Sequence, residues 1–278
     1  MIFTRKRNLN FDHFVPKIDN IPIERKSVAR FLGVLVDEKL TWTQHIAAVK
    51  SKMSRYIGML YKLKHILPMK ARMLTFNSLI QSHINYCSLV WGSTTKNKID
   101  TLFSTQKKAI RAIMPGWVNY FYKDGICPSH TKSTFTQLNV LTVQNIILKN
   151  ILLFMNKIHN YSHLLPASVI NTISPESPSP SSPTDYNSIW YTQHNSAPYN
   201  TSTFFKGPLL YTNIMTTNTE PDNTSLNTYK RGLKAYLLSV QSSGDPEEWS
   251  TDNFRLTNLQ GLRISARIKA QGTINYTE

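Results

Sequence analysis

The sequence has few of the residues on which covalent frameworks and self-contained active sites depend. Its 278 residues include two cysteines, Cys87 and Cys127, and ten glycines. Two cysteines cannot supply a disulfide framework or a four-cysteine zinc site, which favours a reducing, intracellular compartment, cytoplasm or nucleus. No glycine-rich phosphate loop, GxSxG nucleophile elbow or HExxH zinc motif occurs. The chain therefore offers no self-contained active site, and we expect no cofactor in it.

Long apolar runs are missing as well. The most apolar stretch, residues 146–155, is interrupted by Lys149 and Asn150. It is about half of the roughly 20 residues that a membrane-spanning helix needs. The opening MIFTRKRN lacks the apolar run of a signal peptide. We expect neither secretion nor a membrane partner, although an apolar content of 41% is enough for a packed core.

Acidic residues are scarce, and the basic excess is confined to one part of the chain. Lys and Arg total 32 against 16 Asp and Glu, a formal net charge of +16. Residues 1–160 hold 24 basic and 7 acidic residues, whereas residues 161–278 hold 8 and 9. For any single lysine a solvated surface position is the simpler interpretation. The whole block would be self-repulsive, however, and phosphates balance it most simply, which predicts contact with nucleic acid.

The first 36 residues have the pattern of short strands separated by turns. Strands are expected at 1–7, at 17–24 around the turn formers Asp19 and Asn20, and at 29–36 as one strand with the sequence ARFLGVLV. They predict a small antiparallel sheet that needs a neighbour, because three strands are near the minimum for independent stability. The first strand begins at Met1, so no preceding element can cover this strand. We therefore expect the chain to be truncated at its N-terminus.

From Thr41 onward the apolar spacing changes from two to three and four, which predicts helices. Thr41 and Gln44 fit a capping box at the start of the first helix. Further helices are expected from Pro68 to Gly92, at about 97–114 and at 142–160, and short connections predict that the first three form a bundle. The apolar stripe of the first helix comprises Ile46, Val49, Met53, Tyr56, Leu60, Leu63 and Leu67.

The first helix also carries five basic residues away from that stripe. Arg55 and Lys62 project from the opposite side, Lys52 flanks one edge, and Lys50 and Lys64 flank the other. One side of this helix is therefore apolar and the rest is basic. Aromatic residues interleave with these charges, but at helical spacing they more often belong to the core than to a base-stacking surface.

Beyond residue 165 the composition changes. Residues 166–203 are rich in Ser, Pro and Asn and cannot bury enough apolar surface to offset their ordering entropy, which predicts a disordered linker. Residues 204–278 are expected to form a small C-terminal segment, with FFKGPLLYTNIM as a strand or docking segment and a helix at 225–240. The predicted fold class is α+β and mainly α-helical: strands at 1–41, basic helices at 42–165, then the linker and the C-terminal segment.

Three acidic or metal-ligating pairs are candidate sites. Asp37 and Glu38 are adjacent, and consecutive side chains of an extended segment point to opposite faces, so the two carboxylates could not share a metal. Turn preference and the field of the following helix explain them better. Two further pairs lie four residues apart without further ligands at metal spacing, which favours core or surface roles: His83 with Cys87, and His159 with His163.

Several segments in order resemble the region C-terminal to the palm in reverse transcriptases of non-LTR retrotransposons, especially the Jockey-like group. They are MIFTRKR, IDNIPIE, FLGVLVDEKLTWTQHI, LPMKARMLTFNSLIQSHINYCSLVWG and LFSTQKKAIRAIM. SHTKSTFTQLNVLTVQNI, FFKGPLLYTNIM and SLNTYKRGLKAYLLS are similar to the tail of the same reading frames. The resemblance covers most of residues 1–240, and HINYCSLVWG carries much of its weight.

This resemblance implies an RNA-directed DNA polymerase thumb that holds a template and primer duplex of RNA and DNA. It implies that Phe31, Leu32 and Gly33 form a primer grip on a palm-edge strand, with the glycine letting the nucleic acid approach. The following helices would form the thumb. Their phosphate contacts would come from Lys50, Lys52, Arg55, Lys62 and Lys64.

The chain departs from this family at the catalytic centre. The family's enzymes need palm carboxylates that hold two magnesium ions, usually in an aromatic-Ala-Asp-Asp strand, and no such tetrapeptide occurs here. The leading hypothesis is a thumb and tail fragment that binds nucleic acid but does not polymerise. One alternative is part of an intact polymerase whose palm is encoded upstream or supplied by another chain. The other is a helical module that binds nucleic acid or protein without catalysis.

Overall fold

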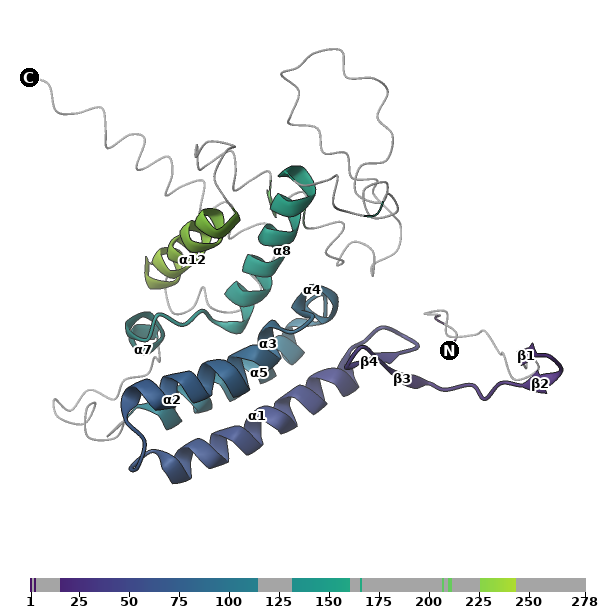
Figure 1. Cartoon of the computed structure of the whole chain (residues 1–278), viewed down its shortest axis with the longest axis horizontal. Coiled ribbons are helices and arrows are strands. Elements are labelled where there is room, and N and C mark those ends of the chain that lie inside the picture. The colour runs from purple at the N-terminus through teal and green to yellow at the C-terminus, as the bar shows by residue number, and fades with distance from the viewer. Residues whose placement is uncertain are drawn as a thin grey trace, which may run out of the picture. The chain divides into compact units, whose positions relative to one another are not determined.

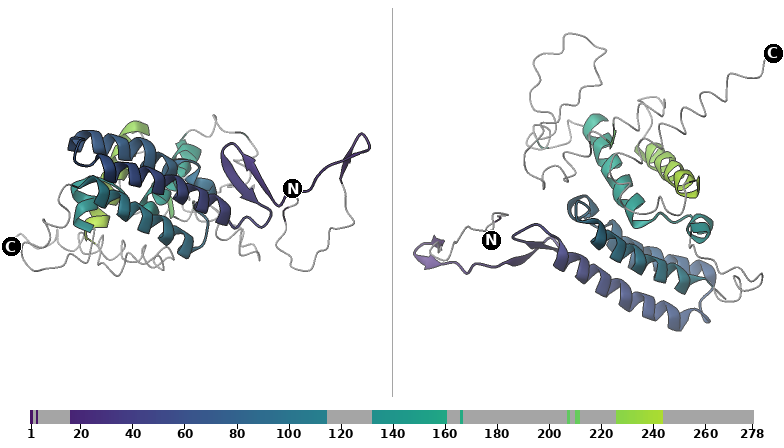
Figure 2. Two further views of the ribbon diagram at one scale, coloured as in Figure 1. Left: turned by 90° about the horizontal axis from the view of Figure 1, so that it is seen from below. Right: turned by 180° about the vertical axis from the view of Figure 1, so that it is seen from behind.

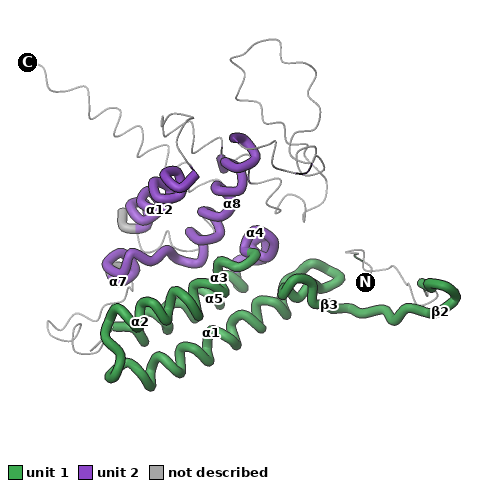
Figure 3. The backbone as a smooth tube through the Cα atoms, viewed as in Figure 1, with its two compact units in different colours: residues 1–87, 97–115 green, residues 88–96, 116–278 purple. Residues whose placement is uncertain are grey.

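The computed structural model describes residues 1, 3, 16–114, 132–160, 166, 207, 210–211 and 226–243, which are mainly α-helical (Figure 1). The expected α+β, mainly helical class is confirmed. The chain divides into two compact units, unit 1 with residues 1–87 and 97–115 and unit 2 with residues 88–96 and 116–278 (Figure 3). The predicted domain boundaries near 41, 165 and 203 stay predictions. The predicted strand at 1–7 and the linker lie almost entirely outside the described residues.

Unit 1 begins with two separate hairpins in place of the expected three-stranded sheet. The first pairs β1 (Lys17–Ile18) with β2 (Ile21–Pro22), and the second pairs β3 (Val28–Phe31) with β4 (Val34–Asp37), both antiparallel. The prediction that 29–36 is one strand was wrong, because the chain reverses at Leu32 and Gly33. Both turns have two residues with positive φ, a conformation that matches the twist of the flanking strands.

The second turn needs outside support. Its first residue, Leu32, has φ of 46°, which is uncommon for a bulky side chain, whereas Gly33 accepts its φ of 82° at little cost. The Tyr86 hydroxyl donates a hydrogen bond to the Leu32 carbonyl at 2.5 Å. The Tyr86 ring also lies 3.6 Å from the place where a Cβ on Gly33 would stand. Tyr86 therefore holds this hairpin tip in place.

Helix α1 (Thr43–Leu63) starts without the predicted capping box. Its N-cap residue is Trp42, with φ of 62° and no side-chain capping bond. Asp37, at the end of β4, instead fixes the two residues that lead into the helix, because its two carboxylate oxygens accept from the backbone N–H groups of Thr41 and Trp42, each at 2.8 Å. The predicted apolar stripe is confirmed at Ile46, Val49, Met53 and Leu60, whereas Tyr56, Leu63 and Leu67 are half-buried and Ile57 is buried in addition. The buried residues of α1 are His45, Ile46, Val49, Met53, Ile57 and Leu60.

The helix expected from Pro68 to Gly92 is interrupted. It consists of α2 (Met69–Phe76), the π-helical turn η1 (Asn77–Gln81) and α3 (Ser82–Asn85), and after a break it resumes as α4 (Ser88–Trp91). Cys87 stands in the break with φ of 49°. The spacing of this helix predicts burial of Met73, Phe76, Leu79 or Ile80, and Ile84; Phe76, Ile80 and Ile84 are fully buried, whereas Met73 is half-buried.

Helix α5 (Lys96–Ile113) completes unit 1, and the predicted three-helix bundle is confirmed (Figure 2). The Arg72 guanidinium donates to the Ile113 carbonyl at 2.5 Å, which ties α2 to the end of α5. At the other end, the Lys98 ammonium donates to the Thr41 carbonyl at 2.5 Å. The spacing of three and four predicts a packed stripe on this helix, and its five positions are all buried: Ile99, Leu102, Gln106, Ile110 and Ile113.

Unit 2 is built around α8 (Val143–Asn160), which confirms the helix predicted at 142–160. Helix α4 packs against α8 and fully buries Trp91. A Cβ on Gly92 would stand 2.7 Å from the Ile147 side chain, so the glycine permits this close approach. The Asn150 amide donates to the Ser88 hydroxyl at 2.6 Å. The HINYCSLVWG element therefore ends as a buried part of unit 2.

The helix predicted at 225–240 is present as α12 (Leu226–Ser243) and packs on α8 and on α7 (Lys132–Gln137). Gln241 anchors it, because its side chain accepts from the Thr142 N–H at 3.2 Å and from the Asn145 amide at 3.0 Å. It also donates to the Val140 carbonyl at 3.1 Å. This buried glutamine holds the end of α12 at the start of α8.

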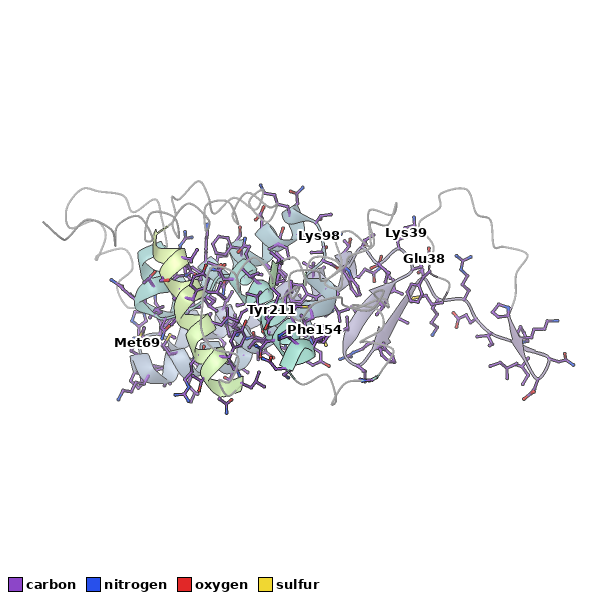
Figure 4. All side chains as sticks on the ribbon, turned by 90° about the horizontal axis from the view of Figure 1, so that it is seen from above. Glu38, Lys39, Met69, Lys98, Phe154 and Tyr211 are labelled. Carbon is purple, nitrogen blue, oxygen red and sulfur yellow. The ribbon has the colours of Figure 1, made fainter. Side chains whose placement is uncertain are left out.

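Part of the FFKGPLLYTNIM segment is described, and these residues favour the docking interpretation over a strand. Gly207 lies close enough to Met155 that a Cβ there would stand 2.7 Å from the methionine sulfur. The Asn156 amide donates to the buried Tyr211 hydroxyl at 3.3 Å (Figure 4). Gly207 and Tyr211 thus pack against α8.

Candidate nucleic-acid interface

The basic residues predicted to contact phosphates are distributed around α1. Lys50, Arg55 and Lys62 are exposed, and Lys52 and Lys64 are half-buried. Arg55 and Lys62 lie seven residues apart on the same outward face, about 10 Å along the helix axis. Within the ranges that the structure describes, none of the five forms an ion pair with an acidic residue. Residues 42–114 contain twelve Lys or Arg and a single acid, Asp100, so this charge is largely uncompensated.

Lys52 belongs to a small cluster between α1 and α3. The rings of Tyr56 and His83 stack at 5.7 Å between centroids and 13° between planes. Burial, and then the charge of Lys52, lower the pKa values of both His83 and His45. The histidines are therefore mostly neutral at pH 7, and Lys52 supplies the positive charge of the cluster.

Lys64 stands at the other end of α1. Its ammonium lies 5.7 Å from the centroid of the exposed Tyr61 ring, within range of a cation–π interaction. The structure thus places Arg55 and Lys62 outward, Lys52 against α3 and Lys64 at the helix end. These residues form a basic surface along one helix, and they do not converge on one point as a small-ligand site would.

The predicted grip residues occupy the tip of the β3–β4 hairpin. Phe31 and Leu32 are 68% and 74% exposed, so two adjacent apolar side chains at this tip are open to contact. The requirement for glycine at position 33 follows from its positive φ and from the Tyr86 ring beside it. Nucleic-acid contact by Phe31, Leu32 and Gly33 stays a prediction.

The acidic pair at 37 and 38 serves the fold, as its structural interpretation predicts. Asp37 accepts bonds from the backbone of Thr41 and Trp42, while Glu38 forms an ion pair with Arg25 at 3.2 Å. The two carboxylates therefore serve different partners. No group of three or more potential metal ligands occurs in the described parts of the chain.

Replacing Asp37 by Asn should lower the free energy of unfolding by about 1–2 kcal/mol at pH 7, because one acceptor for the helix start becomes a donor. Partial burial raises the pKa of Asp37, but the hydrogen bonds from Thr41 and Trp42 outweigh it and the pKa is lowered. This stabilisation is therefore complete above the usual value of 3.8 and is lost as the pH falls below it. Urea unfolding at pH 7 and pH 3 measures both effects.

Glu38→Gln is the matched control, and its exposed ion pair should contribute less than about 1 kcal/mol. Equal stability of wild type and Asp37→Asn at pH 7 would contradict this role of Asp37 at the entry to α1.

Sequence reasoning missed two features of this unit. Tyr86 was not expected to hold the hairpin tip, because the contact joins residues 54 positions apart. Lys107, on α5, lies 4.3 Å from the centroid of the Phe103 ring. Burial and the charge of Arg111 lower the pKa of Lys107, while Asp100 opposes them. The run of charges at 96–111 was the available signal for this second basic helix.

Comparisons with known proteins give a partial relationship. No protein-family model matches the chain, and no solved structure matches it. The chain is similar to the probable RNA-directed DNA polymerase from transposon X-element of Drosophila melanogaster, with 22% identity over 99 residues. The match covers 34% of this chain and 11% of that protein, so the chain spans only a small part of its relative. It supports a relationship to transposon reverse transcriptases.

Among the described helices, none is long and apolar enough to cross a membrane.

Proposed function

We propose that this chain is the thumb and tail part of a non-LTR retrotransposon reverse transcriptase and that unit 1 binds the template and primer duplex. The observation that carries the proposal is the basic surface of α1, whose five cations have no acidic partner within the described residues. The similarity to a transposon RNA-directed DNA polymerase supplies the class of nucleic acid, an RNA–DNA duplex.

The geometry suits binding that ignores base sequence. Lysine ammonium and arginine guanidinium groups along a helix attract phosphates. Contacts of this kind position a duplex without reading its bases. A polymerase must hold every sequence equally, so this mode fits the proposed role. The apolar hairpin tip of Phe31 and Leu32 would lie against the primer strand. Lys50, Lys52, Arg55, Lys62 and Lys64 would contact the backbone.

Polymerisation would require residues that this sequence lacks. In an intact enzyme of the family, palm carboxylates would hold magnesium ions, and the sequence contains no aromatic-Ala-Asp-Asp strand to supply them. We therefore propose that this chain binds without polymerising. Its activity would need a palm, either encoded upstream in the same reading frame or present in another polymerase chain. An in-frame palm in the genomic DNA upstream of Met1 would favour the intact-enzyme alternative.

A salt series tests the proposed binding. The full chain should bind an RNA–DNA duplex of any sequence with similar affinity, and the logarithm of the affinity should fall linearly with the logarithm of salt concentration. The five phosphate contacts from α1 should by themselves contribute about −4 to −5 to this slope. Fluorescence anisotropy with two duplexes of unrelated sequence measures both properties. An affinity that stays constant between low and high salt would contradict the proposal.

A protein interaction module is the second candidate, and the exposed apolar tip of the β3–β4 hairpin favours it. Phe31 and Leu32 would then be buried by another protein. If this is the function, duplex binding should be absent, or reversing the charge of any exposed cation should weaken it equally. Charge-reversal variants of α1 and of the hairpin region distinguish this outcome from binding by the α1 surface.

A further inference from the structure

Lys149 occupies an unusual position in unit 2. It lies half-buried in α8, within the most apolar stretch of the chain. Helix α12, which packs against α8, carries Lys230 and Lys234 four residues apart and hence on one helical face. Gln241 fixes the two helices against each other through its bonds to Thr142 and Asn145.

The anchoring by Gln241 sets which residues of α12 and α8 lie side by side. Lys234 lies seven residues before Gln241 on α12, and Lys149 lies seven residues after Thr142 on α8. At 1.5 Å per residue both are about 10 Å from the anchored point. With the end of α12 held at the start of α8, the lysines of the two helices come to the same level.

The electrostatics of the position are unfavourable in the free protein. Burial lowers the pKa of Lys149, and the charges of Lys230 and Lys234 lower it further. Throughout the described part of unit 2, at residues 88–96, 132–160, 166, 207, 210–211 and 226–243, the sequence has no Asp or Glu. Lys149 and Lys234 are half-buried and Lys230 is exposed, so three like charges influence one another where no described counter-charge lies, which is unfavourable unless an anion joins them.

We propose that Lys149, Lys230 and Lys234 form a phosphate-binding site for a nucleic-acid backbone, separate from the basic surface of α1. Lys230 and Lys234 are spread over about 6 Å of α12, so consecutive phosphates of one strand satisfy them better than a single ion does. Lysine contacts phosphate as a point charge without reading bases, so the site adds affinity without sequence preference. Unit 2 would then contribute to nucleic-acid binding only when α12 is docked.

The test uses the full chain with Lys149→Met, Lys230→Gln and Lys234→Gln combined. Methionine keeps an apolar stem of similar length, so packing is retained while the charge is removed. For duplex binding, the slope of log affinity against log salt should become about 2–3 less steep than in the wild type. The control variant Lys157→Gln with Arg231→Gln, which removes exposed cations from the same two helices, should leave the slope unchanged.

A thermal unfolding series separates this site from a structural lysine. Lys149→Met alone should raise the melting temperature at low salt, because it relieves repulsion, and the rise should vanish at high salt. An oligonucleotide should raise the melting temperature of the wild type more than that of Lys149→Met.

Three outcomes would overturn the proposal. The first is a lower melting temperature in Lys149→Met together with an unchanged salt slope, because this would make Lys149 a packing residue. The second is equal stabilisation by inorganic phosphate and by an oligonucleotide at the same phosphate concentration, because this would exclude the nucleic-acid assignment. The third is an equal change in slope for the control variant. Variants of α1 do not alter these lysines, so failure here is distinguishable from failure of the proposed thumb function.

Discussion

Replacing Lys52, Arg55 and Lys62 together by Glu is expected to weaken duplex binding by at least about 100-fold at 0.1 M salt. Each phosphate contact releases about 0.9 counterion from a duplex, so each is worth somewhat less than tenfold at that concentration. The loss of three contacts therefore lowers the affinity by about 2 to 3 powers of ten. The new carboxylates also repel the phosphate backbone of the duplex. Fluorescence anisotropy on an RNA–DNA duplex measures the change.

The control for charge alone is the triple reversal of Lys17, Lys26 and Lys39. These three exposed cations belong to the hairpin region of unit 1, and their reversal changes the net charge by the same amount. Their loss should weaken binding by less than about tenfold through long-range attraction alone. The circular dichroism of both variants should match the wild type, because every replaced residue is exposed or half-buried. An equal loss of affinity in both variants would remove the α1 surface from the proposed interface.

The helical part of the fold was predictable because each helix buries one continuous stripe. Ile99, Leu102, Gln106, Ile110 and Ile113 recur at spacings of three and four, and all five are buried in α5. A stripe of this kind is a local property of the sequence, and it does not depend on which element the helix packs against. The same reasoning located α8 and α12 to within a few residues.

The turns and helix starts were less predictable because distant groups decide them. Leu32 and Gly33 carry no Asn or Asp to mark a two-residue turn, unlike Asp19 and Asn20, and the turn depends on Tyr86. The start of α1 depends on a carboxylate from the preceding strand, not on Thr41. In both places a contact across the fold overrides the local preference that the sequence displays.

The two candidate sites differ in the same way, because one depends on residues close in sequence and the other on distant ones. The basic surface of α1 could be predicted because its charges are close in sequence and lie opposite a clear apolar stripe. The lysine site of unit 2 could not, because Lys149 and Lys230 are 81 positions apart and meet only after Gln241 has anchored α12. Lys149 appeared in the sequence only as an interruption of an apolar run.

The Trp91→Ala variant should lower the free energy of unfolding of unit 2 by about 3–5 kcal/mol, the range for removing a fully buried large aromatic side chain. Trp91 has no exposed surface, and α4 holds it against α8 with the help of the Ser88 and Asn150 hydrogen bond. Four residues of helix cannot remain ordered without that contact. Hydrogen exchange in α4 and α8, together with urea unfolding, measures the loss.

Two further variants decide whether Trp91 acts in the core or in nucleic-acid binding. Trp91→Phe keeps most of the buried surface and should cost clearly less than Trp91→Ala, whereas Tyr61→Ala, at an exposed position, should change stability by less than about 0.5 kcal/mol. A Trp91→Ala protein that keeps its stability but loses duplex affinity would show that the indole stacks on bases. Because the indole is fully enclosed, we expect the opposite: stability falls, and duplex binding by the α1 surface persists while unit 1 remains folded.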